Sequence, residues 1–234
     1  MSSFVLVHGA WGGSWGFRHL RRPLTTAGHE VFTPSLTGIG ERQHLTSPEV
    51  GLSTHIDDVV NLVTCEDLDS IVLLGFSYGG MVVTGALAQI ADRVRHLVYL
   101  DALVPEDGQS VSSITGIDAA GLTGTSGWLI PPTPRELATP EKTAWAARRR
   151  SPQPVRTFTE PVSLPRPLAD HDLSLTYIKA TADEQEAEDS GFWQAANRAG
   201  ASERWRYEEI ATNHMIPLMA PDQLAGLLLD IAAG

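Results

Sequence analysis

The sequence is poor in cysteine, in basic side chains and in long apolar runs, and each shortage excludes a class of protein. One cysteine, Cys65, cannot form a disulfide within the chain, so we predict a reducing, cytoplasmic location. Lys and Arg number 17 against 28 Asp and Glu, and the net charge of -11 argues against nucleic-acid partners. No apolar run approaches the ~20 residues of a membrane span, and no signal peptide is recognisable. We therefore expect no membrane partner.

The apolar residues that are present, 42% of 234, suffice for the core of one domain. Short apolar runs that predict buried strands alternate with stretches that predict helices. This alternation is typical of right-handed βαβ units. We predict an α/β fold, with a mostly parallel sheet of about six strands and helices on both faces. The expected strands cover residues 4–7, 31–33, 71–74, 94–100, 175–180 and, as an edge strand, 205–210.

The pattern breaks between residues 105 and 172. Ten of the fifteen prolines lie here, so this stretch is predicted to be an insertion rather than a continuation of the sheet. Because it also carries aromatic side chains, we expect a cap or lid over a site. The alternative is an irregular surface segment whose aromatics pack only on each other. The core would then consist of residues 1–104 and 173–234.

Three smaller features carry expectations of their own. Cys65 follows an apolar helical run at 59–63 and is predicted to be buried. Ser53 is a candidate N-cap for that helix. The only basic cluster, 148–150, is predicted to be a solvated helix end rather than an anion site.

The stretch from Gly75 to Gly79 has the pattern Gly-x-Ser-x-Gly between a predicted strand and a predicted helix. A serine on such a turn adopts a strained backbone, and small residues on either side let strand and helix approach closely. Its hydroxyl then projects above the sheet edge, beside a helix N-terminus. We predict that Ser77 is a nucleophile.

A serine hydroxyl needs a base, and the base needs an orienting acid. His214 lies just past the last predicted strand, at the carboxyl edge of the sheet, and is the expected base. Asp183 and Asp101 each follow a strand directly. Asp183 gives the chain order Ser, Asp, His and is the expected acid, with Asp101 as the alternative. Four other histidines are assigned surface roles by default: His19, His29, His55 and His96.

An oxyanion hole needs two converging N–H groups, and the backbone amides of Tyr78 and Ala10 are the candidates. Ala10 lies in a glycine-rich loop after the first strand, which the ring of His8 is expected to brace. This loop fits neither the dinucleotide fingerprint nor the phosphate-loop pattern. We therefore expect no cofactor and no metal.

Four separated motifs together resemble one family. They are Val7-His8-Gly9-Ala10-Trp11, Gly75-Phe76-Ser77-Tyr78-Gly79, Thr181-Ala182-Asp183-Glu184 and Asn213-His214-Met215. This set resembles the α/β-hydrolase branch of plant methyl esterases and hydroxynitrile lyases, with their bacterial esterase relatives. The resemblance covers the chain except the cap. It also implies that the first two strands of larger α/β-hydrolases are missing here.

The resemblance further separates esterases from lyases. Lyases of this branch carry threonine after the first-strand histidine and lysine after the catalytic histidine, where its charge steadies departing cyanide. Here these positions are Gly9 and Met215. Because methionine cannot stabilise an anion, ester hydrolysis is favoured.

We therefore expect a serine esterase that cleaves a small or aromatic carboxylic ester through an acyl-enzyme. Alternatives are a hydroxynitrile-lyase-like or C–C-cleaving enzyme on the same triad, or a hydrolase-fold ligand receptor with little turnover. The sequence leaves the oligomeric state, including a homodimer, open. The residues expected to line the substrate pocket are Gly9, Trp11, Phe76, Trp128, Trp145 and Met215.

Overall fold

A six-stranded sheet forms the centre of the computed structural model, which describes residues 1–183 and 186–234. The strands lie in the order β2-β1-β3-β4-β7-β8, and all neighbours are parallel, as predicted. β8 forms one edge of the sheet, which confirms its assignment as an edge strand. The bounds are β1 (Ser3–Val7), β2 (Glu30–Phe32), β3 (Ile71–Phe76), β4 (Val94–Leu100), β7 (Ser174–Ala180) and β8 (Trp205–Ile210).

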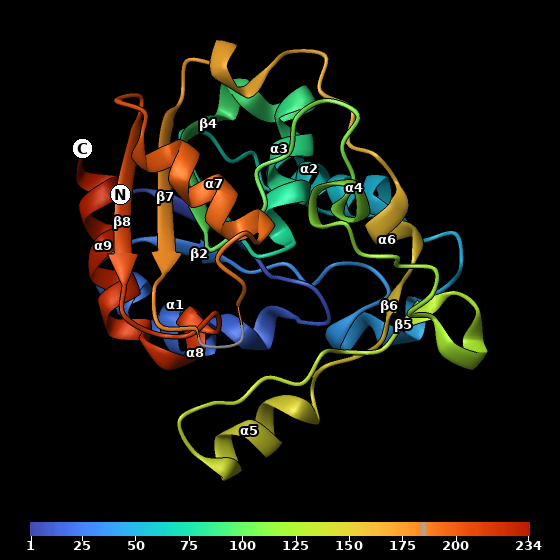
Figure 1. The fold of residues 1–234 in the computed structure, drawn as a ribbon. Helices are drawn as coiled ribbons and strands as arrows, with labels where there is room; N and C mark the ends of the chain where they lie inside the picture. Colours follow the sequence, from blue (N-terminus) through green and yellow to red (C-terminus); the bar gives the residue numbers. More distant parts are fainter. Residues whose placement is uncertain (184–185) are drawn as a thin grey trace.

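Helices cover both faces of this sheet (Figure 1). Successive side chains of a strand point to opposite faces, so β1 sends Val5 and Val7 into one core and Phe4 and Leu6 into the other. The first core is shared with α2, α3 and α7, and the second with α1 and α9. These helices are α1 (Arg18–Thr26), α2 (Leu52–Cys65), α3 (Gly79–Ile90), α7 (Gly191–Gly200) and α9 (Pro221–Ala233).

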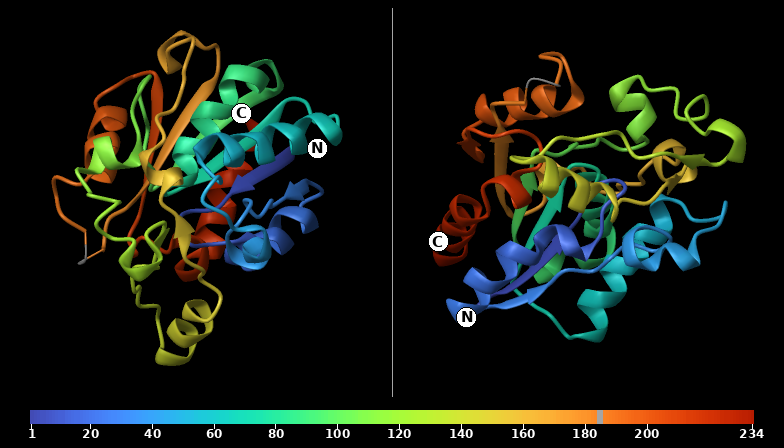
Figure 2. Two further views of the ribbon diagram at one scale, coloured as in Figure 1. Left: turned by 90° about the vertical axis from the view of Figure 1, so that its right-hand side faces the viewer. Right: turned by 90° about the horizontal axis from the view of Figure 1, so that it is seen from below.

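The segment 105–172 adds no strand to the six-stranded sheet. Its two short strands pair with each other in antiparallel fashion. Figures 1 and 2 show α5 projecting beyond the strand ends toward which the β7 and β8 arrows point. The segment contains α4 (Val111–Thr115), β5 (Leu129–Ile130), α5 (Pro140–Ala147), β6 (Gln153–Pro154) and α6 (Arg156–Thr159).

The remaining elements are short. α8 (Ile216–Met219) precedes α9. Short 3₁₀ helices cover Ser14–Phe17, Gly40–Leu45, Ala91–Arg93, Gly124–Ser126 and Leu168–Asp170. Among the described residues, none of the helices is both long and apolar enough to cross a bilayer.

Two local predictions about α2 were wrong. Cys65 is exposed, because the buried face of α2 carries Val59 and Val63, and a residue two positions after Val63 points away from it. α2 begins at Leu52 after Gly51, so Ser53 lies inside the helix, where its hydroxyl donates to Glu160.

The surface role assigned to two histidines was also wrong. His55 is completely buried, and His96 is 6% exposed. His55 lies on the buried face of α2, and its ring contacts Tyr78.

Candidate active site

Ser77 follows β3 directly and has a φ of +57°, which is the left-handed region that non-glycine residues rarely adopt. Such a turn requires strand and helix to approach closely. A Cβ at Gly75 would lie 2.6 Å from the carbonyl oxygen of Gly79, and a Cβ at Gly79 would lie 2.6 Å from that of Val7. The backbone is fixed by the N–H of Ser77, which donates to the carbonyl of Leu100.

His214 lies in the loop between β8 and α8, and its ring meets the serine. Nε2 is 2.9 Å from Oγ of Ser77, and both residues are buried. The aromatic rings of Phe76 and Phe192 lie on the imidazole at centroid distances of 4.9 and 5.1 Å. These contacts restrict the orientation of the imidazole.

Asp101, the alternative acid, occupies the position at His214 that was expected of Asp183. Its Oδ2 lies 2.6 Å from Nδ1 of His214. The Nδ1–H therefore donates to the carboxylate, which leaves Nε2 free to accept from the hydroxyl of Ser77. Oδ2 of Asp183 instead accepts the backbone N–H of His214 at 3.0 Å and pairs with Arg135 at 3.2 Å. The chain-order argument therefore selected the wrong carboxylate for the ring.

The local backbone explains this difference. β4 and β7 are adjacent and parallel, so Asp101 and Asp183 both emerge at the same sheet edge. Asp101 has a φ of +41°, and its N–H donates to the carbonyl of Ile178 at 2.7 Å. The chain therefore turns sharply after β4, and the side chain of Asp101 lies in the sheet edge beneath His214.

The charge of Asp101 is balanced by a buried lysine. Nζ of Lys179 lies 2.7 Å from Oδ1 of Asp101 and 2.6 Å from Oε2 of Glu186, and it lies over the ring of Trp193. Burial by itself raises the pKa of Asp101. The hydrogen bond and charge of His214, with the charge of Lys179, outweigh it and hold the pKa below the ordinary value. The carboxylate is thus ionised at neutral pH.

The two expected oxyanion donors, the N–H groups of Ala10 and Tyr78, line the same cavity as Ser77. Within the part of the chain that the structure describes, neither N–H donates to a protein acceptor. His8 braces the loop before Ala10, as expected: its Nδ1–H donates to the carbonyl of Gly9, and its Nε2 accepts the N–H of Leu36. Burial lowers the pKa of His8, so this ring is neutral.

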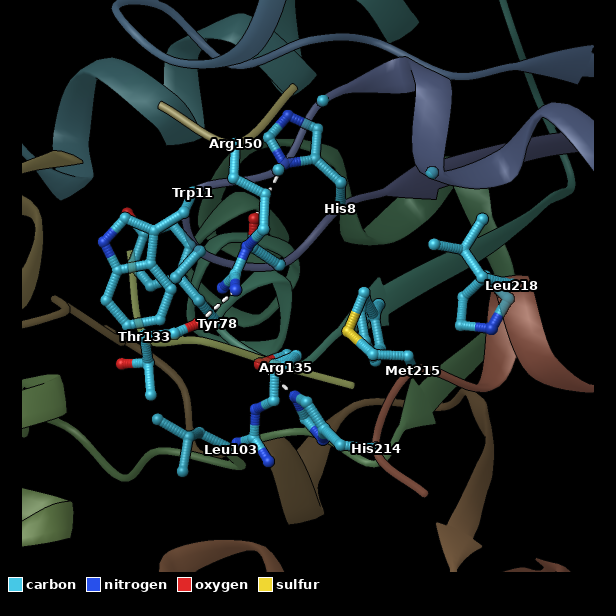
Figure 3. A pocket seen from close by; sticks show the side chains of 18 of the residues that line it. His8, Trp11, Tyr78, Leu103, Thr133, Arg135, Arg150, His214, Met215 and Leu218 are labelled. Carbon is cyan, nitrogen blue, oxygen red and sulfur yellow. Dashed lines mark hydrogen bonds between the residues drawn. The ribbon is translucent and has the colours of Figure 1, made fainter. Parts of the chain in front are cut away.

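These groups open into a largely apolar cavity of about 290 Å³ (Figure 3). Of the residues expected to line the pocket, four do so: Gly9, Trp11, Phe76 and Met215. Trp11 has a φ of +59°, and its indole N–H donates to the carbonyl of Ile130, so it joins the first loop to the segment 105–172.

Trp128 and Trp145 are not among the described residues that line this cavity. Trp145 packs edge-on against Trp15, and the guanidinium groups of Arg18 and Arg149 lie 5.3 and 4.2 Å from its ring centroid. Trp128 lies beside the short hairpin, where its carbonyl accepts the N–H of Val155. Trp145 therefore joins the segment 105–172 to residues near the N-terminus.

Several side chains at the site were missed by sequence reasoning. The sequence could have indicated the buried ion pair of Lys179, since a lysine within an otherwise apolar strand needs a buried partner. Glu186 is the second carboxylate that contacts the buried ammonium group of Lys179. Arg150 was assigned to a solvated cluster but lines the cavity. Glu184, part of one motif, lies outside the described residues. Those residues contain no cluster of side chains that could hold a metal ion.

Comparison with known proteins identifies the family of this chain. The alpha/beta hydrolase family matches residues 4–227. A carbendazim hydrolyzing esterase from Nocardioides sp. (strain SG-4G) is 44% identical over 180 residues, which are 70% of this chain and 74% of the relative. Salicylic acid-binding protein 2 from Nicotiana tabacum is 27% identical over 256 residues, covering 98% and 96% of the two chains.

A solved structure supports the same fold. An extracellular alpha/beta-hydrolase from a Paenibacillus species, which shares structural and functional homology with the tobacco protein, superposes with a TM-score of 0.86 at 24% identity over 98% of each chain. With the parallel sheet, the serine elbow and the family match in agreement, this chain is an esterase-type member of the alpha/beta hydrolase family.

Proposed function

We propose that this chain is a serine esterase in which Ser77 is the nucleophile, His214 the general base and then acid, and Asp101 the orienting acid. The observation that carries the proposal is the continuous relay of short contacts, 2.9 Å from serine to imidazole and 2.6 Å from imidazole to carboxylate. These are hydrogen-bond distances suited to proton transfer.

Acylation would begin when His214 Nε2 takes the proton of Ser77 while Oγ attacks the ester carbonyl. The negative charge that develops on the carbonyl oxygen would be stabilised by the N–H groups of Ala10 and Tyr78. Each such donor is typically worth about 3 kcal/mol in the transition state. The imidazolium that forms is stabilised by the ionised Asp101.

The tetrahedral intermediate then collapses as His214 Nε2–H protonates the departing alkoxide, which leaves as the alcohol. A water molecule, deprotonated by the same nitrogen, attacks the acyl-enzyme. Collapse of the second intermediate returns the proton to Ser77 and releases the carboxylic acid. The fixed tautomer of His214 serves both halves of the reaction.

The substrate class follows from the cavity. A volume of about 290 Å³ lined mainly by apolar side chains suits a small or aromatic carboxylic ester. We propose that the segment 105–172 acts as a cap between core parts 1–104 and 173–234, since Arg150 and Phe158 come from it and line the same cavity. The cytoplasmic location stays a prediction.

A panel of methyl, aryl, short-chain and lactone esters, assayed with wild type and Ser77→Ala, tests the proposal. We expect turnover by wild type and a loss of at least a thousandfold in Ser77→Ala, with circular dichroism unchanged. Ester turnover that survives in Ser77→Ala would overturn the proposal.

Two controls separate the alternative functions. Cyanide release from mandelonitrile without ester turnover would indicate a lyase. Thermal stabilisation by a ligand without any turnover would indicate a receptor. Met215, beside His214, supplies no charge of the kind expected in a lyase.

A further inference from the structure

Two arginines enter the same cavity as Ser77 and His214. Arg135 and Arg150 both line it, and both come from the segment 105–172. Figure 3 shows the guanidinium of Arg150 beside the ring of Trp11, among the side chains that face the cavity. The neighbouring Arg148 and Arg149 are exposed, so only Arg150 of this basic cluster turns inward.

Arg150 is not neutralised by the protein. One guanidinium nitrogen donates to the carbonyl of Thr133, and the group lies 5.3 Å from the centroid of Trp11. Among the described residues, no carboxylate lies within ion-pair distance of it. Arg135 differs, because it pairs with Asp183 at 3.2 Å.

The surroundings of the Arg150 guanidinium disfavour its charged form. Burial, and secondly the charge of Arg135, lower the pKa of Arg150 to about 10. The group therefore remains protonated at neutral pH. A guanidinium carries five N–H donors in a planar fork that matches a carboxylate. In a chain with 28 acidic and 17 basic residues, a half-buried arginine that faces a cavity and lacks a carboxylate partner is a site at which an anion would be stabilised.

We propose that Arg150 binds an anionic group of the substrate, so that the preferred ester carries a carboxylate away from its scissile bond. The inference rests on the proposed esterase function and narrows its substrate class. The apolar wall with Trp11 and Phe76 would hold the body of the substrate, and Arg150 would hold its charged end. Arg135 contributes a second positive charge at long range, while its own hydrogen bonds go to Asp183.

Matched esters test this proposal. Monomethyl terephthalate carries a carboxylate para to its ester, and methyl 4-methylbenzoate is its neutral counterpart. The readout is the ratio of kcat/KM for the charged ester to that for the neutral one. We expect this ratio to fall about tenfold to a hundredfold in Arg150→Gln, because a charge-assisted contact is lost. Arg150→Lys keeps the positive charge and should retain part of the preference for the charged ester.

Arg148→Gln is the control, since it removes the same charge from an exposed position two residues away. The ratio should stay within twofold of wild type. A ratio equally unchanged in Arg150→Gln, or hydrolysis of the neutral ester without the charged one by wild type, would overturn the inference and leave the esterase function standing. Hydrolysis of neither ester would count against the esterase function itself.

The affinity for the charged ester tests the role of Arg150 without any turnover. The dissociation constant of monomethyl terephthalate, measured by calorimetry on Ser77→Ala, should rise at least tenfold in Ser77→Ala/Arg150→Gln. Equal affinity in the two variants would contradict the proposal whatever the esterase assays show.

Discussion

Nζ of Lys179 lies 2.7 Å from Oδ1 of Asp101, and both side chains are completely buried. The other carboxylate oxygen, Oδ2, contacts Nδ1 of His214. Asp101 is therefore held from two sides, by an imidazole above and an ammonium group behind it. This arrangement fixes the direction of the carboxylate and keeps it charged in an apolar interior.

Replacement of Asp101 by asparagine should lower kcat for an ester by about 10⁴-fold. An amide at this position can donate to Nδ1, which favours the tautomer that cannot accept the proton of Ser77. Asp183→Asn is the matched comparison and should lose far less, because Asp183 accepts the backbone N–H of His214. If Asp183→Asn lost as much as Asp101→Asn, the assignment of the acid would be in error.

Lys179→Met should move the acidic limb of the pH profile of kcat/KM to higher pH. Without the ammonium group the pKa of Asp101 rises, so its carboxylate becomes protonated at a higher pH than in wild type. The free energy of unfolding should also fall by about 3–5 kcal/mol, since two buried carboxylates lose their partner.

Two further variants make the lysine experiment specific. Lys142→Met removes the same charge from an exposed position and should leave both the profile and the stability unchanged. Lys179→Met/Glu186→Gln should regain part of the lost stability, because one unpaired carboxylate is removed. An unchanged pH profile in Lys179→Met would show that the lysine acts only on stability.

His55 should make the protein less stable as the pH falls below neutral. Burial lowers its pKa to about 4, against an ordinary value of 6.5, and its neutral ring donates from Nε2 to Thr37 and accepts at Nδ1 from Tyr78. Between pH 4 and 6.5 the unfolded chain binds the proton and the folded chain does not, so stability is lost as pH falls through this window.

The contribution of His55 amounts to as much as about 3 kcal/mol between pH 7 and pH 4. Urea unfolding at several pH values measures it. His55→Gln should flatten this dependence, and His19→Gln, at an exposed position, should not. Equal slopes in wild type and His55→Gln would contradict the account.

Gly9→Ala should lower kcat/KM by about tenfold to a hundredfold. The added Cβ would lie 2.8 Å from Cβ of Ser77, which displaces the nucleophile by a fraction of an ångström. Gly226→Ala is the comparison, because a Cβ there meets nothing within 4 Å and lies in α9, where alanine favours helix. Full activity in Gly9→Ala would mean that the loop can move away from the serine.

Sequence reasoning found the sheet because its strands are apolar runs bounded by turn residues, a local signal. The contact between Ser77 and His214 was likewise predictable, since each residue follows the end of a strand. The choice between Asp101 and Asp183 was not, because β4 and β7 end side by side at one edge. Only the turn of the chain after Leu100 decides which carboxylate reaches the ring.

The wrong predictions for single side chains outside the triad share a cause. Cys65 and Arg150 were judged from composition around them, whereas their exposure depends on the direction in which a single residue points. Trp128 and Trp145 were expected in the pocket because aromatics suit apolar ligands. Trp145 instead packs against Trp15, and the backbone of Trp128 pairs with Val155, and both contacts depend on the tertiary structure of the segment 105–172.

Covalent labelling with a fluorophosphonate tests the central claim most directly. After reaction of the wild-type protein, peptide mass spectrometry should place one adduct on Ser77, and labelling should slow by orders of magnitude in Asp101→Asn but not in Asp183→Asn. An adduct on another residue, or undiminished labelling of Ser77→Ala, would contradict the account.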